Sequence, residues 1–118
     1  MDNRYEVKQV TIANAARTSS IAELFLDQQL VAIEIDGAVT NTGFNIEFNT
    51  HETSGSKVWN RLKDIGTTTD YNVAVSGAGV YPVKLDNTVC GPQFIRLYGA
   101  SGNEGADRTI NLIFRILR

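Results

Sequence analysis

Cysteine, histidine and long hydrophobic runs are scarce in this 118-residue sequence. The single cysteine, Cys90, cannot form a disulfide within the chain, so we expect folding in a reducing compartment such as a cytoplasm. No apolar run approaches the roughly 20 residues that a membrane-spanning helix needs. Residues 1–6 lack the apolar stretch of a secretory signal peptide. We therefore expect no membrane as a partner.

An excess of basic residues is also missing. The chain has 11 Lys and Arg against 13 Asp and Glu, which gives a net charge of −2. Such a chain has no basic field to attract phosphates, so we do not expect nucleic acid as a partner. Hydrophobic content of 42% and charged content of 20% are typical of a globular protein. Without repeats or linkers, residues 1–118 form one predicted domain.

The scarcity of histidine and cysteine limits the available chemistry. His51-Glu52 begins like a zinc-protease motif, but Gly55 stands where the second histidine is needed. A solvated loop histidine is the interpretation we favour for His51. Cys90 precedes a Gly-Pro turn and is predicted to be a small buried residue rather than a nucleophile. We expect no enzyme activity, no catalytic residue and no cofactor.

What the sequence does contain is alternation of apolar and polar residues. In the closing segment, Ile110, Leu112, Phe114 and Ile116 share one parity, which in a strand places them on one face. The same period of two recurs in Val31–Ile35, Phe44–Phe48, Tyr71–Val75 and Tyr81–Leu85. These segments predict half-buried strands that pack one face on a common core.

Near the start of the chain the alternation changes parity. Tyr5 and Val7 are odd-numbered, whereas Val10 and Ile12 are even-numbered. One extra residue in a strand flips the pleat, so we predict a β-bulge near Gln9.

Residues 21–26 have helical spacing, but a strong strand follows at once. We favour a short strand or a single turn there. The total is then eight or nine strands with no helix of normal length, separated by turn formers such as Gly77-Ala78-Gly79, a predicted hairpin turn. This pattern predicts an all-β fold, an antiparallel β-sandwich or barrel.

The loop Asp64–Asp70 offers two carboxylates and several hydroxyl groups. A calcium ion needs about six to eight oxygens, and the loop lacks the Asp/Asn repetition of calcium loops. We therefore favour turns closed by side chains over a metal site. The same reasoning applies to Asp86-Asn87, and to Asn103 with Glu104 and Asp107.

Aromatic and arginine residues allow two interpretations each. Trp59, Tyr71, Tyr81 and Tyr98 could stack on a sugar, but core packing is the better account for most of them. The arginines of the late strands, Arg96, Arg108 and Arg115, are predicted to be solvated on outer faces. Their alternative role is to pair with carboxylates of a neighbouring subunit.

Six segments together resemble a known family of small virion proteins of tailed bacteriophages. They are Leu30–Ile35, Phe44–Asn49, Lys57–Leu62, Tyr81–Asp86, Phe94–Gly99 and Ala106–Arg115. The resemblance covers about residues 28–117. The Trp and Ile-Arg-Leu segments are also similar to galactose-binding-like β-sandwiches, although this chain is shorter and lacks their paired cysteines.

The phage resemblance implies a jelly-roll capsid decoration (cement) protein on the outside of the virion head, assembled in the host cytoplasm. Its partners would be the major capsid protein and copies of itself, a trimer being favoured. The segment Asn14–Ser20 is a candidate arm, with contacts from Asn14, Arg17, Thr18 and Ser19. A simple strand connection is the alternative. The alternative function is a carbohydrate-binding or host-adhesion module of a tail or baseplate.

Overall fold

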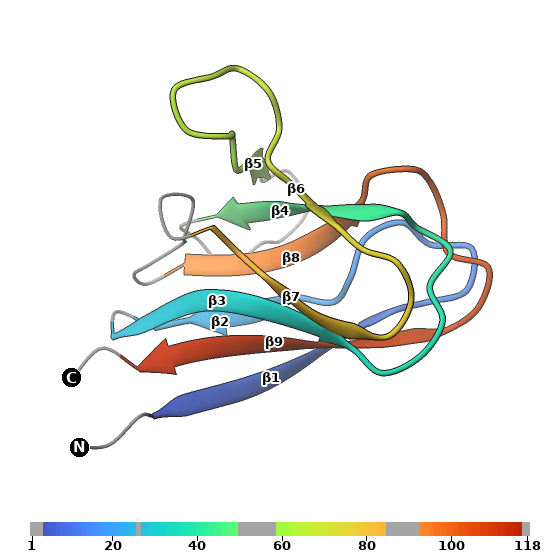
Figure 1. Ribbon diagram of the computed structural model, residues 1–118, viewed down its shortest axis with the longest axis horizontal. Coiled ribbons are helices and arrows are strands. Elements are labelled where there is room, and N and C mark those ends of the chain that lie inside the picture. Colours follow the sequence, from blue (N-terminus) through green and yellow to red (C-terminus); the bar gives the residue numbers. More distant parts are fainter. Residues whose placement is uncertain (1–3, 26, 50–58, 85–92, 117–118) are drawn as a thin grey trace.

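Two antiparallel β-sheets face each other in this computed structural model, which describes residues 4–25, 27–49, 59–84 and 93–116 (Figure 1). The prediction of an all-β sandwich is confirmed, and no helix occurs in the described ranges. The nine strands are β1 (Tyr5–Ile12), β2 (Ala22–Leu24), β3 (Gln28–Ile35), β4 (Gly43–Asn49), β5 (Asn60–Arg61), β6 (Asn72–Ala74), β7 (Gly79–Pro82), β8 (Gln93–Gly99) and β9 (Arg108–Ile116).

The chain crosses repeatedly from one sheet to the other. One sheet has the order β1-β9-β3-β7, and the other has the order β2-β8-β4-β5, with β6 also paired to β4. Strand β8 occupies one edge of β4, so β5 and β6 share the opposite edge, one after the other. Strands that are distant in sequence, such as β1 and β9, therefore become neighbours.

The core lies between the sheets and follows the predicted parity of the closing segment. Ile110, Leu112 and Phe114 of β9 have no exposed surface, and Phe44 and Ile46 of β4 face them with none either. Burial of each such side chain contributes about 1.5–3 kcal/mol. The single-parity row of the closing strand is therefore a main contributor to the stability of the sandwich.

The predicted bulge near Gln9 is wrong. Strand β1 pairs with β9 in one continuous register, from Tyr5 opposite Arg115 to Ile12 opposite Arg108. Without a bulge, the odd residues keep facing away from the core. Tyr5 and Val7 are therefore 59% and 57% exposed on the outer face of their sheet.

The irregularity lies instead in β3, where the register with β9 shifts between Leu30 and Ala32. The shift turns Leu30 inward together with Ile33 and Ile35, all of which are buried, and leaves Val31 partly exposed. Leu30 and Val31 are both apolar, so the pattern of residues alone could not say which of them enters the core.

Of two further segments, 21–26 agrees with its prediction and Gly77–Gly79 does not. The segment 21–26 contains the short strand β2, with Leu24 fully buried, as expected. The turn at Gly77–Gly79 is not a hairpin, because β6 and β7 belong to different sheets. Gly77 and Gly79 have φ angles of 77° and 155°, which glycine adopts without steric cost, and the Tyr81 hydroxyl donates to the Gly77 carbonyl (2.9 Å).

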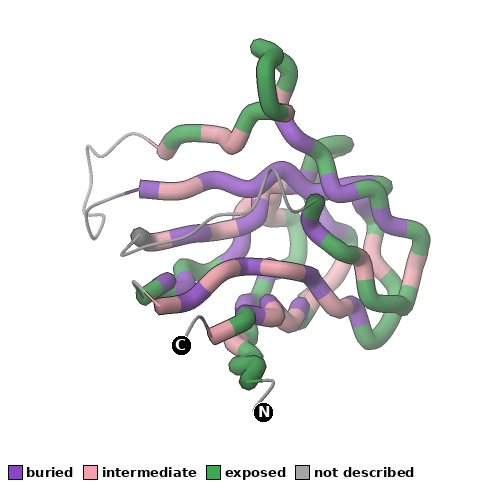
Figure 2. Tube along the Cα trace, turned by 60° about the vertical axis from the view of Figure 1, so that its left-hand side comes forward, coloured by how far each residue is buried: buried purple, intermediate pink, exposed green. Residues whose placement is uncertain are grey.

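Strand β4 is buried on both faces, although its sequence has the alternation of a half-buried strand. Asn45, Glu47 and Asn49 on its outer face are 5–6% exposed. Figure 2 shows this strand in purple along nearly its whole length. The Asn45 amide donates to the Tyr71 carbonyl (3.2 Å), so its buried polar group is satisfied. Along β4, the outer face of this sheet therefore carries polar side chains that are buried and hydrogen-bonded.

Gly99 permits a close approach at the end of β8. A Cβ atom there would lie 2.5 Å from the Asn41 side-chain nitrogen and 2.6 Å from the Gly102 carbonyl oxygen. We expect Gly99→Ala to lower the free energy of unfolding by about 1–3 kcal/mol, the usual cost of overpacking. Gly37→Ala is the matched control, because no atom lies within 4 Å of its added Cβ. Equal urea midpoints for the two variants would contradict this prediction.

Candidate functional site

The most developed surface feature is a cluster on the outer face of the five-stranded sheet, which we call the arginine–aromatic ladder. Pairing of β8 with β4 creates it, because Ile95 and Leu97 point into the core and Arg96 and Tyr98 must point outward. The ladder consists of Arg17, Tyr98, Arg61, Glu47, Arg96 and Trp59.

Glu47 is the centre of the ladder. In the register, Glu47 of β4 lies opposite Arg96 of β8 on one side and Arg61 of β5 on the other. Arg96 Nε donates to Glu47 Oε1 (2.8 Å), and Arg61 Nε donates to Oε2 (3.1 Å). The carboxylate is only 6% exposed, so each oxygen exchanges water for a charge-assisted hydrogen bond. The pair of bonds fixes both guanidinium groups in place.

The guanidinium groups also lie over aromatic rings. Arg96 Cζ lies 4.4 Å from the centroid of Trp59, and Arg61 Cζ lies 3.9 Å from that of Tyr98. Arg17 Cζ is 4.4 Å from the same tyrosine ring. These distances are within the range of cation–π attraction. These contacts restrain five side chains on the outer face of the sheet.

The ladder carries an excess of positive charge. Asp70 accepts from Arg61 Nη1 (3.2 Å) and from Lys63 Nζ (2.5 Å), and the lysine is the main reason that the pKa of Asp70 is lowered. Glu47 and Asp70 together pair with three cations, Arg61, Lys63 and Arg96, and Arg17 adds a fourth positive charge over the Tyr98 ring. In a chain with a net charge of −2, this is a local basic patch that favours an acidic partner surface.

The predicted candidate arm is held against the sandwich. Gly99 N–H donates to the Arg17 carbonyl (2.8 Å), and Thr18 forms a bridge with Tyr98. Asn14 N–H donates to Asp107 Oδ1 (2.8 Å) at the surface. Ser19 is 7% exposed and its hydroxyl accepts from Leu97 N–H (2.9 Å), so little of it can reach a partner. The segment connects β1 to β2 and contributes Arg17 to the ladder, and its role as a partner-contact arm stays a prediction.

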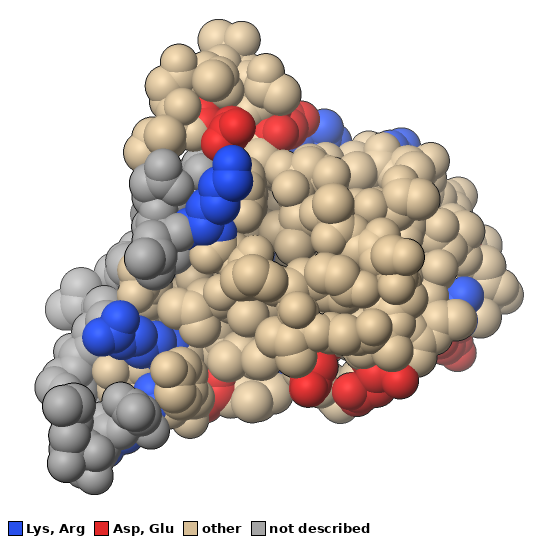
Figure 3. All heavy atoms as spheres, in the orientation of Figure 1, with Lys and Arg blue, Asp and Glu red and all other residues tan. Residues whose placement is uncertain are grey.

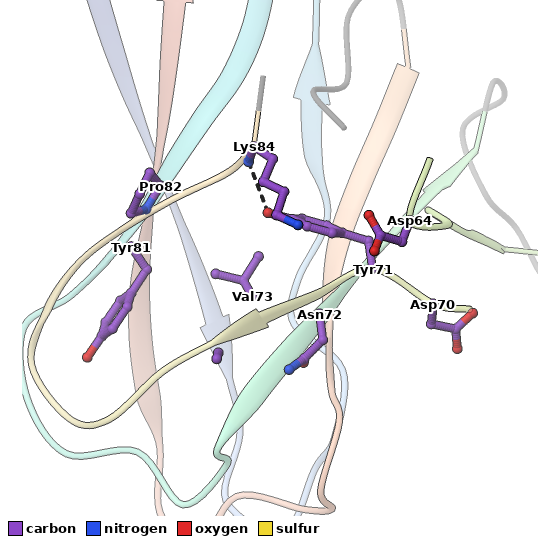
Figure 4. A pocket seen from close by; sticks show the side chains of 9 residues that line it. Asp64, Asp70, Tyr71, Asn72, Val73, Tyr81, Pro82 and Lys84 are labelled. Carbon is purple, nitrogen blue, oxygen red and sulfur yellow. Dashed lines mark hydrogen bonds between the residues drawn. The ribbon is translucent and has the colours of Figure 1, made fainter. Parts of the chain in front are cut away.

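A hollow of about 370 Å³ opens where β6 and β7 diverge, below the loop 62–70 (Figure 4). Figure 3 views this side, where charged groups lie mainly at the margins of an uncharged surface. Tyr71 and Tyr81 line the hollow, but the Tyr71 hydroxyl accepts from Lys84 N–H (2.9 Å) and Tyr81 is bonded within its own turn. The described residues that line it include Asp64, Asp70 and Lys84 but no serine, threonine, cysteine or histidine.

The loop 64–70 is closed by its own hydrogen bonds, as the turn interpretation predicted. Thr67 N–H donates to the Asp64 carbonyl (3.0 Å), and Thr69 N–H donates to the Thr67 hydroxyl (3.1 Å). Asp70 pairs with cations of its own chain. Within the described ranges, no group of three or more His, Cys, Asp or Glu side chains could hold a metal ion.

Glu104, which was predicted to bond to backbone groups rather than to bind a metal, is a buried structural acid. It is 1% exposed, and its oxygens accept from Thr40 N–H (2.7 Å), Asn41 N–H (2.9 Å) and Asn41 Nδ2 (2.6 Å). Arg108 Nε donates as well (3.0 Å). These bonds outweigh the effect of burial and lower the pKa of Glu104 to about 2. Arg108, which was predicted to be solvated, thus forms an ion pair within its own chain.

Several predicted residues lie outside the described ranges, namely His51, Cys90 and Asp86-Asn87. Of the four aromatic candidates, Tyr71 is 6% exposed and Tyr81 packs against the core, as expected. Trp59 and Tyr98 are partly exposed in the ladder instead. No helix among the described residues has the length and apolarity to span a membrane.

Sequence reasoning missed the two residues that organise the ladder, Glu47 and Arg61. Both stand at polar positions of short alternating segments, which in sequence look like solvated faces. The available signal was one Glu in the segment Gly43–Asn49 and one Arg in each of the segments Asn60–Arg61 and Gln93–Gly99. Comparisons of the chain with protein-family models, curated proteins and solved structures find no match.

Proposed function

We propose that this protein is a non-catalytic component of a bacteriophage virion, a capsid decoration (cement) protein that binds the head surface and stabilises contacts between capsomers. The arginine–aromatic ladder is the observation that carries this proposal. Residues that dominate protein–protein binding energy are most often Trp, Tyr and Arg, clustered on a rigid surface. Trp59, Tyr98 and the guanidinium groups have this composition and are held by cation–π contacts on one sheet face.

The topology supports the proposal that the sandwich is a jelly roll. If β5 and β6 count as one interrupted strand, each sheet has four strands, ordered β1-β9-β3-β7 and β2-β8-β4-β5/β6. Most successive strands then alternate between sheets. Jelly rolls are common in viral capsid proteins and in lectins, so this support is an analogy of fold.

The proposed mechanism needs no reaction. The ladder would meet an acidic patch of the major capsid protein, where guanidinium groups donate paired hydrogen bonds to carboxylates. Specific interfaces bury on the order of 1,600 Å² in total, so the loops at the rim of this sheet would add contact area. An oligomer would attach at several points and gain avidity without new contacts.

Binding to virion heads stripped of the protein tests the proposal. We expect Trp59→Ala and Arg96→Ala to weaken binding by about 2 kcal/mol each, which is roughly thirtyfold. Arg115→Ala is the matched control, because it removes an exposed arginine from the outer face of the other sheet. The control should bind as the unchanged protein does.

Binding to tails or baseplates in place of heads would contradict the placement on the capsid. The carbohydrate alternative makes a separate prediction, since Trp59 is partly exposed beside polar groups. It requires a signal on a glycan array that Trp59→Ala abolishes. Against it, the guanidinium of Arg96 already contacts the tryptophan ring, so a sugar would have to displace it to stack there.

A further inference from the structure

Strand β1 stands at one end of the four-stranded sheet, and no described strand pairs with its outer edge. Ile116 N–H donates to the Arg4 carbonyl (3.0 Å), and this bond fixes the alternation along β1, because hydrogen-bonded and non-bonded pairs take turns in an antiparallel ladder. Even-numbered residues of β1 direct their backbone groups to β9. Tyr5, Val7 and Gln9 therefore direct their N–H and C=O groups to the free edge.

The chain itself covers the next position along this edge. Thr11 N–H donates to the Ser20 hydroxyl (3.0 Å), and Ser20 N–H donates to the Thr11 carbonyl (2.8 Å). These bonds confirm that the odd residues of β1 face the edge. The open stretch is thus limited to residues 5–9.

The two ends of this sheet are built differently. Val83 N–H donates to the Val31 carbonyl (2.8 Å), so the nitrogen of Pro82 faces the free edge of β7, which is four residues long. A proline at that position blocks pairing with another strand. Strand β1 is eight residues long, contains no proline and keeps one register throughout. Its edge lacks a proline, a bulge and a short length, although two charged residues, Glu6 and Lys8, lie along it.

The side chains of the open stretch are apolar on the outer face. Tyr5 and Val7 are 59% and 57% exposed, which is unusual for large hydrophobic residues. Val7 also begins an apolar row that crosses the sheet by register, through Ile113 and Ala32 to Pro82. The edge therefore joins backbone groups that no described strand pairs to an apolar row in which Val7 and Pro82 are exposed, Ile113 is partly exposed and Ala32 is buried.

We propose that β1 pairs with β1 of a second copy of this chain, antiparallel, about a two-fold axis at Val7. In this register Tyr5 lies opposite Gln9 of the other copy, and Glu6 lies opposite Lys8. Every free backbone group of residues 5–9 then forms a hydrogen bond, and each Glu6 meets an opposite charge. Glu6 and Lys8 are 45% and 19% exposed and lie 3.6 Å apart within one chain. Glu6 also accepts from Gln28 Nε2 (2.6 Å), and Lys8 donates to Gln28 Oε1 (3.0 Å) and to the Glu23 carbonyl, so the dimer would add a charge pair to contacts that each chain already makes.

Charge selects this register over its neighbours. An axis shifted by one residue to Glu6 would place two glutamates directly opposite each other, and an axis at Lys8 would do the same with two lysines. Like charges directly opposite destabilise a strand pair. Of these three axes, only the one at Val7 makes both cross-strand pairs complementary. The two four-stranded sheets then become one continuous sheet, and the apolar rows of both copies meet at Val7.

The dimer is independent of the proposed capsid binding, because the ladder lies on the other sheet. Sedimentation equilibrium over a range of concentrations up to submillimolar tests it, with the full chain. We expect a reversible dimer of about twice the 12.9 kDa of one chain. Val7→Pro removes the central N–H at a position compatible with an edge strand, so it should give a folded monomer. Val7→Thr keeps the N–H and a branched side chain, and it should still dimerise.

Charge reversal keeps the test valid if the proline variant does not fold. Glu6→Lys and Lys8→Glu should each weaken the dimer about tenfold or more, and the double exchange should restore it. Hydrogen exchange adds a readout by residue: the amides of Val7 and Gln9 should become protected as concentration rises, while those of Glu6 and Lys8 are protected throughout. A monomer at all concentrations, a trimer, or a dimer unaffected by these variants would overturn the proposal.

Discussion

Glu104→Ala should lower the free energy of unfolding by about 3–5 kcal/mol, as removal of one member of a buried charge network does. The loss would leave the guanidinium of Arg108 and the amide groups of Thr40 and Asn41 without their acceptor. Urea unfolding followed by tryptophan fluorescence measures the change, since Trp59 is the only tryptophan.

The control for this variant is Glu23→Ala, which removes an exposed carboxylate from β2. It should change the free energy of unfolding by less than about 0.5 kcal/mol. The loss of unfolding free energy in Glu104→Gln should lie between those of Glu104→Ala and Glu23→Ala. Its amide oxygen can still accept a hydrogen bond, but its NH₂ group would face other N–H donors and could not pair with them. A loss below about 1 kcal/mol in Glu104→Ala would show that the network contributes little net stability.

The same carboxylate predicts how stability depends on pH. Its pKa is about 2 in the folded protein, against 4.5 for an ordinary glutamate. A lowered pKa stabilises the fold above pH 4.5, and this contribution, about 3 kcal/mol, is lost as the pH falls from 4.5 towards 2. Glu104→Gln should flatten the acid limb of the stability profile in this window. The lowered pKa of Asp70 leaves some acid sensitivity in the variant.

Phe114→Ala should lower the free energy of unfolding by about 3–5 kcal/mol, because it removes a fully buried ring from β9 and leaves a cavity. The adjacent residue provides the control. Ile113 lies on the outer face of the same strand and is partly exposed, so Ile113→Ala should cost less than about 1 kcal/mol. Thermal unfolding at low protein concentration compares the two, and equal losses would contradict the assigned faces of β9.

Local information in the sequence was sufficient for the strands. The parity of Ile110, Leu112 and Phe114 identified a core strand because side-chain direction in a strand depends only on position along it. Turn residues such as Gly66 and Gly102 marked chain reversals, and both have positive φ angles in the structure. Parity did not locate the bulge, since both Leu30 and Val31 suit the core and only pairing with β9 decides between them.

The candidate site depended on contacts that no local pattern contains. Glu47 looks like a solvated residue in sequence, and it becomes buried because β8 and β5 bring Arg96 and Arg61 to its two oxygens. Glu104 lies in a loop, and it is buried because Arg108 and the segment at Thr40 supply donors to its carboxylate. Partners for polar groups are chosen by strand order, which is a property of the whole fold.

The sequence by itself determined that the fold is all-β, with alternating strands and a closing core strand. Alternation, turn residues and composition act through neighbours in the chain, so they can be interpreted without coordinates. Only the tertiary structure decided which polar residues meet, which edge stays open and where the bulge lies. Those features depend on pairing between strands far apart in sequence, such as β1 with β9 and β4 with β8.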